Sequence, residues 1–243
     1  MKKIVNSLIV IAFTLVVWQA LAWLINSPIV PSPWLVIANL ITSLGDKLPQ
    51  HIGMSALRVT ASSFFALLIG VPLGIAIGYK ASWDRVLSPF IYLSYPIPKL
   101  ALLPIIMLLF GLGEISKTLM IFLIIFFPIV VDCAGAVKAM DKEVFMVLRA
   151  FGAGGKYICA KIVAPGIIPD ILVSLKITTG IALSILFFAE NFGTQTGLGY
   201  LIMTSWQKLD YVNLYTGILT LSLLGLAIFL ILDILEKKLT AWK

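Results

Sequence analysis

Six apolar stretches, each about as long as a membrane is thick, constrain the fold of this chain more than any other feature. They occupy residues 8–25, 59–79, 90–110, 118–137, 171–189 and 214–235. A helix needs roughly 20 apolar residues to cross a bilayer core of about 30 Å. Lipid offers no hydrogen bonds, so a spanning segment must satisfy its backbone internally, as a helix does. We therefore expect an all-α integral membrane protein with about six transmembrane helices in one membrane domain, residues 1–243.

Composition supports this class. Hydrophobic residues make up 60% of the 243 and charged residues 12%, whereas soluble domains carry about 25% charged residues. The net charge of +7 does not indicate a nucleic-acid partner, because Lys and Arg of membrane proteins gather in cytoplasmic loops.

The distribution of these cations predicts the orientation. Four of the 18 Lys and Arg residues fall in segments on one side of the spans, namely Lys47, Arg58, Lys117 and Lys208, and Lys99 lies inside a span. The other thirteen fall on the opposite side, at Lys2, Lys3, Lys80, Arg85, Lys138, Lys142, Arg149, Lys156, Lys161, Lys176, Lys237, Lys238 and Lys243. By the positive-inside rule, we expect these thirteen cations and both chain termini to lie on the cytoplasmic side of an inner or plasma membrane.

The first stretch also resembles a secretory signal. Lys2 and Lys3 precede an apolar run that ends near Ala20-Leu21-Ala22, a small-residue cleavage site. The run is longer than the usual signal core of about 7 to 15 residues, which favours a retained span. Either way, the next span begins outside.

Catalytic and metal-binding motifs are absent from the sequence. His51 is the single histidine, no H-E-x-x-H occurs, and Cys133 and Cys159 fall in or beside the cytoplasmic side, where thiols stay reduced. A phosphate-binding loop requires G-x-x-x-x-G-K-[ST], but Gly155-Lys156 is followed by tyrosine and Ala150 stands at the first glycine position. We expect no enzyme activity and no cofactor in this chain.

Residues 138–170 form the largest cytoplasmic loop. Asp141 and Glu143 predict the start of a helix, and Val144, Val147, Leu148 and Phe151 follow on one face at helical spacing. Glycines between residues 152 and 155 predict a turn, and residues 156–164 a second short helix that a proline ends. A basic amphipathic helix of this kind either lies on lipid headgroups or docks on a soluble partner, and its residues alone do not decide between the two.

Two outer segments also have helical spacing. Residues 28–50 begin with prolines and continue as an apolar pattern too short to span, which predicts an interfacial helix. Residues 190–211 begin with glycine turns and predict a short amphipathic helix.

The chain resembles the permease subunits of ATP-binding-cassette importers, among them the nitrate, sulfonate and taurine branch. The motifs are VPSP at 30–33, YPIPKLALLP at 95–104, FGLGEISK at 110–117, AE at 189–190 and GLGYLI at 197–202. The family signature is E-A-A, three residues, G, nine residues and I-x-L-P. Gly152 takes the glycine place, and Ile162 and Pro165 take closing places. The sequence departs from the signature at Met146-Val147-Leu148, where E-A-A would stand, and at Ala164, which replaces the leucine.

This resemblance implies a type I importer (MetI-like) permease fold in which residues 141–165 couple to a separate ATPase. The implied coupling residues are Leu148, Arg149, Ala150, Phe151, Gly152, Ala153, Gly154, Lys156, Ile162 and Pro165. The implied partners are a cytoplasmic ATPase dimer that carries ATP and magnesium, an extracytoplasmic solute-binding protein, and a second permease, identical or related. The solute would be small, polar and anionic.

Several residues inside the spans have possible roles. Gly70, Gly74 and Gly78 recur every four residues and predict a close helix contact, within the chain or at a subunit interface. Candidate pathway residues are Pro98, Lys99, Thr178, Thr179, Ser184 and Glu190. Lys99 would either attract an anion or snorkel to the cytoplasmic surface.

The acids at the span ends have alternatives too. Glu190 would gate the path, pair with Arg58 or Lys208, or be wetted outside, and Asp132 would pair with Lys176. The competing class, a secondary transporter or channel, tends to show repeated halves and charged sites at mid-membrane; this sequence shows neither apart from Lys99.

Overall fold

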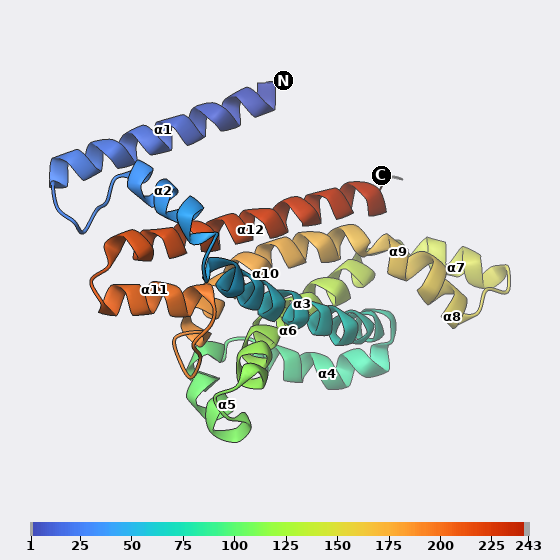
Figure 1. Ribbon diagram of the computed structural model, residues 1–243. Coiled ribbons are helices and arrows are strands. Elements are labelled where there is room, and N and C mark those ends of the chain that lie inside the picture. The colour runs from blue at the N-terminus through green and yellow to red at the C-terminus, as the bar shows by residue number, and fades with distance from the viewer. Residues whose placement is uncertain (1, 241–243) are drawn as a thin grey trace. The chain divides into compact units, whose positions relative to one another are not determined.

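A computed structural model describes residues 2–240, and within this range every regular element is a helix (Figure 1). The all-α prediction is therefore confirmed. The long helices are α1 (Lys2–Ile25), α3 (Leu48–Tyr79), α6 (Glu114–Ala139), α10 (Ile168–Ala189) and α12 (Tyr211–Leu239). The shorter elements are α2 (Pro33–Ser43), α4 (Ala81–Ser94), the 3-10 helix η1 (Lys99–Leu102), α5 (Leu103–Phe110), α7 (Lys142–Ala150), α8 (Gly155–Ile158), the π-helix η2 (Cys159–Val163), α9 (Ala164–Gly166) and α11 (Leu198–Gln207).

Among the described residues, four helices are long and apolar enough to span a membrane, namely α3, α6, α10 and α12. The pair formed by α4 and η1–α5 qualifies only as one span bent by 82°. The apolar part of α1, Ile9–Ile25, is shorter than these four helices, which have 22 to 32 residues, so the described residues hold four spans, or five with the bent pair, where about six were expected. The chain packs as two compact units: residues up to Ser55 with Glu190–Leu224 form unit 1, and Ala56–Ala189 with the residues from Gly225 onward form unit 2.

Within unit 2, α3 and α6 approach each other closely along a row of glycines. A Cβ atom added to Gly70 would lie 3.1 Å from Ile129, one added to Gly74 would lie 2.6 Å from Cβ of Cys133, and one added to Gly78 would lie 2.6 Å from Cβ of Val137. Each step of four residues toward the C-terminus of α3 is matched by a step of four residues toward the C-terminus of α6, so the two helices run parallel. The glycine row therefore lies against another helix of the same chain.

The parallel direction of α3 and α6 requires the chain between them to return across unit 2. The bent pair of α4 and η1–α5 makes this return. The predicted span 90–110 is consequently not one helix. Pro96 and Pro98 lie in the break, and because proline has no backbone N–H, neither can donate a helical hydrogen bond there.

Ion pairs connect the helices of unit 2. Arg58 on α3 holds Glu114 at the start of α6 through two hydrogen bonds of 2.6 Å. Lys176 on α10 bonds to Asp233 and Glu236 on α12. The expected pair of Lys176 with Asp132 is therefore wrong: Lys176 lies toward α12, whereas Asp132 is exposed on α6.

Unit 1 contains both outer segments predicted to be helical. α2 is joined to the start of α12, because Asn39 donates hydrogen bonds of 2.9 Å to Asn213 and Thr216. α1 meets the same helix, where the ring of Trp18 stacks on that of Tyr215 at 5.7 Å.

The glycine row allows a direct test of the fold. We expect Gly74→Ala to lower the free energy of unfolding by about 1–3 kcal/mol, because the added methyl group would overlap Cys133 and force the helices apart. Thermal melting in detergent measures the effect. Gly135→Ala on α6 is the matched control, since a Cβ there meets nothing within 4 Å. Equal melting temperatures for the two variants would contradict the close approach.

Candidate functional site

The segment between α6 and α10 begins with a capped helix. The side chain of Asp141 accepts a hydrogen bond of 2.8 Å from the backbone N–H of Glu143, which satisfies one of the free donors at the start of α7. Glu143 adds a negative charge to the first turn, and Arg149 adds a positive charge to the last, so both complement the helix dipole.

α7 ends in a glycine turn with a defined hydrogen-bond pattern. The backbone N–H of Ala153 donates to the carbonyl of Leu148, and that of Gly152 donates to the carbonyl of Arg149, both at 2.9 Å. Gly152 has φ +80°, the left-handed conformation that this Schellman motif requires. The glycine of the family signature is therefore the residue that lets the chain reverse after α7.

The inner side of the segment packs on unit 2. Phe145, Leu148 and Ala153 cover a buried cluster that contains Val137, Ile158 and Val163. Phe145 also meets Tyr79 at the end of α3, with ring centroids 5.9 Å apart. Figure 1 shows α7, α8 and α9 together beside the start of α10.

The outer side of α7 carries exposed apolar residues. Val144 is 45% exposed, Val147 54% and Phe151 85%. The predicted apolar face is therefore divided: Leu148 turns inward with Phe145, and the other three residues turn outward. Ala150, Gly154 and Lys156 are exposed as well.

The second half of the segment is helical but irregular. Gly154 accepts the hydrogen bond that starts α8, from the N–H of Ile158 at 3.1 Å. The π-helix η2 follows and contains Ile162, and α9 contains Pro165; both side chains are half-buried. Gly166 follows directly and lies close to Met140, since a Cβ added to it would lie 2.5 Å from the methyl carbon of that residue.

The candidate pathway residues on α10 do not share one face. Thr178 and Thr179 are 2% and 1% exposed, and their hydroxyls donate to carbonyls of their own helix, such as Leu175. Ser184 is exposed, as is Gly180. The exposed side is also lined by Ile177 and Ile181. Thr178 and Thr179, predicted as pathway residues, therefore do not lie on the exposed side that carries Ser184, and their hydroxyls are satisfied inside the helix.

Lys99 lies at the break of the bent span, directly after Pro98. Its ammonium donates to the carbonyls of Ser94 and Tyr95 at the end of α4. It also lies 5.1 Å from the ring centroid of Tyr95 and 4.8 Å from that of Phe127. The cation thus caps α4, where the helix dipole favours a positive charge, and the two rings add cation–π contacts.

Glu190 in unit 1 caps another helix. Its carboxylate accepts hydrogen bonds from the hydroxyl of Ser55 at 2.8 Å and from the N–H of Gly199, in the first turn of α11, at 2.7 Å. Ser55 in turn accepts the N–H of Leu198 at 2.8 Å. Because Glu190 is fully buried, the expectation that water surrounds it is wrong.

Sequence reasoning did not select Ser55 or His51, although both are buried here. Nδ1 of His51 lies 3.0 Å from both the N–H and the carbonyl of Gly197, and its tautomer decides whether it accepts from the first or donates to the second. The stretch GLG at residues 197–199 could have indicated that such residues are needed. A helix that starts on glycines has no side-chain cap of its own, so its first N–H groups need acceptors from elsewhere.

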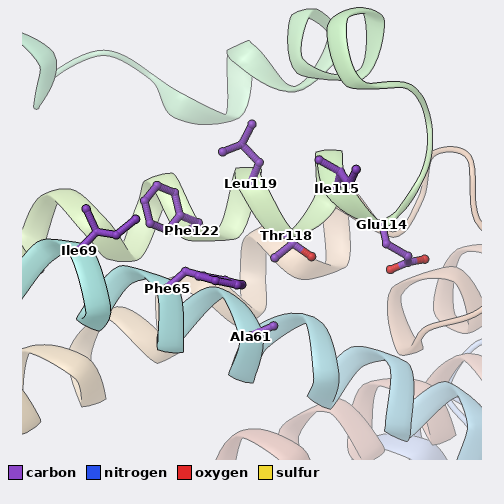
Figure 2. Close-up of a pocket in the computed structure, with 8 residues that line it drawn as sticks. All are labelled: Ala61, Phe65, Ile69, Glu114, Ile115, Thr118, Leu119 and Phe122. Carbon is purple, nitrogen blue, oxygen red and sulfur yellow. The ribbon is translucent and has the colours of Figure 1, made fainter.

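An apolar groove of about 490 Å³ lies between α3 and α6 in unit 2. Figure 2 shows Phe65 and Ile69 of α3 and Phe122 of α6 along this groove, with Glu114 at one end and the side chain of Leu119 pointing away from α3. No group of three His, Cys, Asp or Glu side chains able to hold a metal occurs in the part of the chain that the structure describes.

Comparison with known proteins gives concordant matches. Residues 70–241 match the family described as "Binding-protein-dependent transport system inner membrane component". The taurine transport system permease protein TauC of Escherichia coli (strain K12) is 32% identical over 99% of this chain and 90% of its own length. The putative aliphatic sulfonates transport permease protein SsuC of Bacillus subtilis (strain 168) is 27% identical over 98% of this chain and 87% of its own.

A solved structure supports the fold. A chain from an inward-facing crystal form of the MetNI methionine ABC transporter superposes with a TM-score of 0.67 at 19% identity, covering 79% of this chain and 96% of that one. At this identity the likeness shows the fold, that of a type I importer permease. Together with the sequence matches, it shows that the chain belongs to the family of binding-protein-dependent transport system inner membrane components, the permease subunits of ATP-binding-cassette importers.

Proposed function

We propose that this permease forms, with a second permease, the pathway for a small anionic solute, and that a separate ATPase drives it through residues 141–165. A solute-binding protein delivers the solute from outside. The chain crosses the inner or plasma membrane several times with both termini in the cytoplasm. ATP and magnesium bind to the ATPase, and this chain performs no covalent chemistry.

The exposed side of α7 carries the coupling proposal. Val144, Val147 and Phe151 expose apolar surface on a helix whose other side is fixed by Phe145 and Leu148. A helix held in this way can enter a groove of a soluble partner with little loss of conformational freedom, and its apolar residues then act as anchors.

The exposed side of α10 is our candidate for the contact with the second permease. Ile177 is 63% exposed and Ile181 50%, and both flank Gly180, where a Cβ would meet nothing within 4 Å. Small residues between apolar ones allow helices to approach in lipid. The solute path would then run along this contact, with Ser184 as a polar group beside it.

The solute class rests on the relatives. Their names refer to taurine and aliphatic sulfonates, and another relative, from Halalkalibacterium halodurans, is named for formylaminopyrimidine. We propose a sulfonate-like anion and alternating access, in which closure of the ATPases moves the segment 141–165 and reorients the spans. Uptake of labelled taurine by the reconstituted importer, with formylaminopyrimidine as the competing ligand, tests this choice.

Phe151→Ala tests the docking side. We expect binding of the ATPase to weaken about thirtyfold, the effect of losing a central anchor worth about 2 kcal/mol, with no change in melting temperature. Co-isolation from detergent and a binding titration measure it. Phe145→Ala on the inner side is the matched control and should lower the melting temperature. If the ATPase never co-isolates with the wild-type chain, and Gly152→Glu leaves uptake intact, a secondary transporter becomes the better explanation.

Ser184→Cys tests the contact between permeases. In a Cys159→Ser background we expect a short bismaleimide to join two copies, or a copy and its sister carrying the equivalent cysteine, in native membranes. Thr178→Cys on the same helix should not react, since that position is buried. The readout is the band of doubled mass on a denaturing gel. Its absence for Ser184→Cys and for Gly180→Cys would place the partner elsewhere.

A further inference from the structure

A second cleft in unit 2 lies on the opposite side of α7 from the docking residues. It has a volume of about 560 Å³ and lies between the ends of α3 and α6 and the helix α7. The lining residues that matter here are Tyr79, Lys138, Lys142, Phe145, Met146 and Arg149. We refer to it as the α7 cleft.

The α7 cleft is cationic. Three of its lining side chains are basic and none of the lining residues, all in the described part of the chain, is acidic. Lys138 bonds to Asp84 at 2.7 Å but stays 48% exposed, and Lys142 is exposed. An ammonium group has three donors, so Lys138 keeps donors for a ligand.

Arg149 is oriented for recognition. Among the described residues no acid pairs with its guanidinium, which donates to the hydroxyl of Tyr79 at 3.2 Å and lies 5.9 Å from the centroid of that ring. The hydrogen bond and the cation–π contact hold the guanidinium beside Tyr79, and its fork of N–H donors matches the oxygens of a phosphate group.

The rest of the lining is apolar. Phe145 and Met146 from α7 and Val137 from α6 face the same space, and Met146 is 63% exposed. A site for a free ion has no need of such a surface. Cations beside exposed apolar side chains instead fit a ligand with an anionic head and a hydrocarbon tail, in a volume typical of ligand sites.

We propose that the α7 cleft binds an anionic phospholipid of the cytoplasmic leaflet, with its phosphodiester on Arg149, Lys142 and Lys138. The first methylenes of the lipid lie along Phe145 and Met146. Basic pockets between the cytoplasmic ends of spans are suited to anionic headgroups, and the cation count predicts this side to be cytoplasmic.

The geometry of α7 keeps this site apart from the three apolar residues proposed to anchor the ATPase. At 100° per residue, Lys142, Phe145, Met146 and Arg149 fall within about 100° of one another, and Val144, Val147 and Phe151 fall on the opposite side. One side of the helix thus faces the lipid while the other remains open. The lipid site rests on the cleft alone and does not depend on the proposed coupling.

Native mass spectrometry of the purified full chain tests the site with dioleoyl phosphatidylglycerol as the probe and dioleoyl phosphatidylcholine as the neutral comparison. We expect one phosphatidylglycerol to be retained preferentially. The double variant Lys142→Gln, Arg149→Gln should bind it about 25-fold more weakly, at roughly fivefold per cation. Lys161→Gln, an exposed cation outside the cleft, is the matched control and should bind as the wild type does.

Further measurements distinguish a bound lipid from free phosphate and show whether each variant is folded. Met146→Glu, which places an acid in the cleft, should also weaken binding, and thermal melting shows that each variant is folded. Equal retention of both lipids, equal retention by the double variant, or displacement of the lipid by millimolar inorganic phosphate would overturn the proposal. Phe151→Ala should keep the lipid while losing the ATPase, so the two proposals fail independently.

Discussion

The close approach of α3 to α6 is the contact on which the rest of unit 2 depends. Lipid is as apolar as the side chains, so helices in a membrane associate mainly through close packing, and three glycines at four-residue steps provide it here. The contact makes the two helices parallel, which obliges the chain between them to return as a broken span. It also brings Tyr79, at the end of α3, beside the end of α6. Phe145 and Leu148 of α7 pack against these two helix ends.

Charged residues in this protein act largely at helix ends. Lys99 caps α4, Glu190 caps α11, and Arg58 ties α3 to the first residue of α6. A charge near the membrane is expensive, and a free carbonyl or N–H at a helix end is expensive for the same reason. The caps made by Lys99 and Glu190 offset both costs, and the pair of Arg58 with Glu114 offsets the cost of its two charges. An ionisable residue in a span is therefore weak evidence of a transport site unless its surroundings leave it without such a role.

Much of the fold follows from sequence, because apolar length and cap residues act locally. The ranges of α6, α10 and α12, the cap at Asp141 and the turn at Gly152 are of this kind. What could not be predicted depends on neighbours that periodicity does not reveal. Leu148 turns inward because Phe145 and Ala153 meet the same cluster, and Thr178 is buried with its hydroxyl bonded to its own backbone. In the sequence, the break between α4 and η1 is marked only by its prolines. A proline permits a bend but does not determine the bend angle.

The connections of the segment 141–165 have a mechanical consequence. Only Met140 and Asp141 separate α6 from α7, and only Ile167 separates α9 from α10. The first backbone hydrogen bonds of α10 run across that junction, from Ile171 to Ile167 and from Ile167 to Val163. A force applied at Phe151 therefore reaches α6 and α10 without passing through a long flexible connection to either helix. It must displace α6 and α10, which pack along each other, so under the proposed coupling a movement of the ATPase would be passed to both helices.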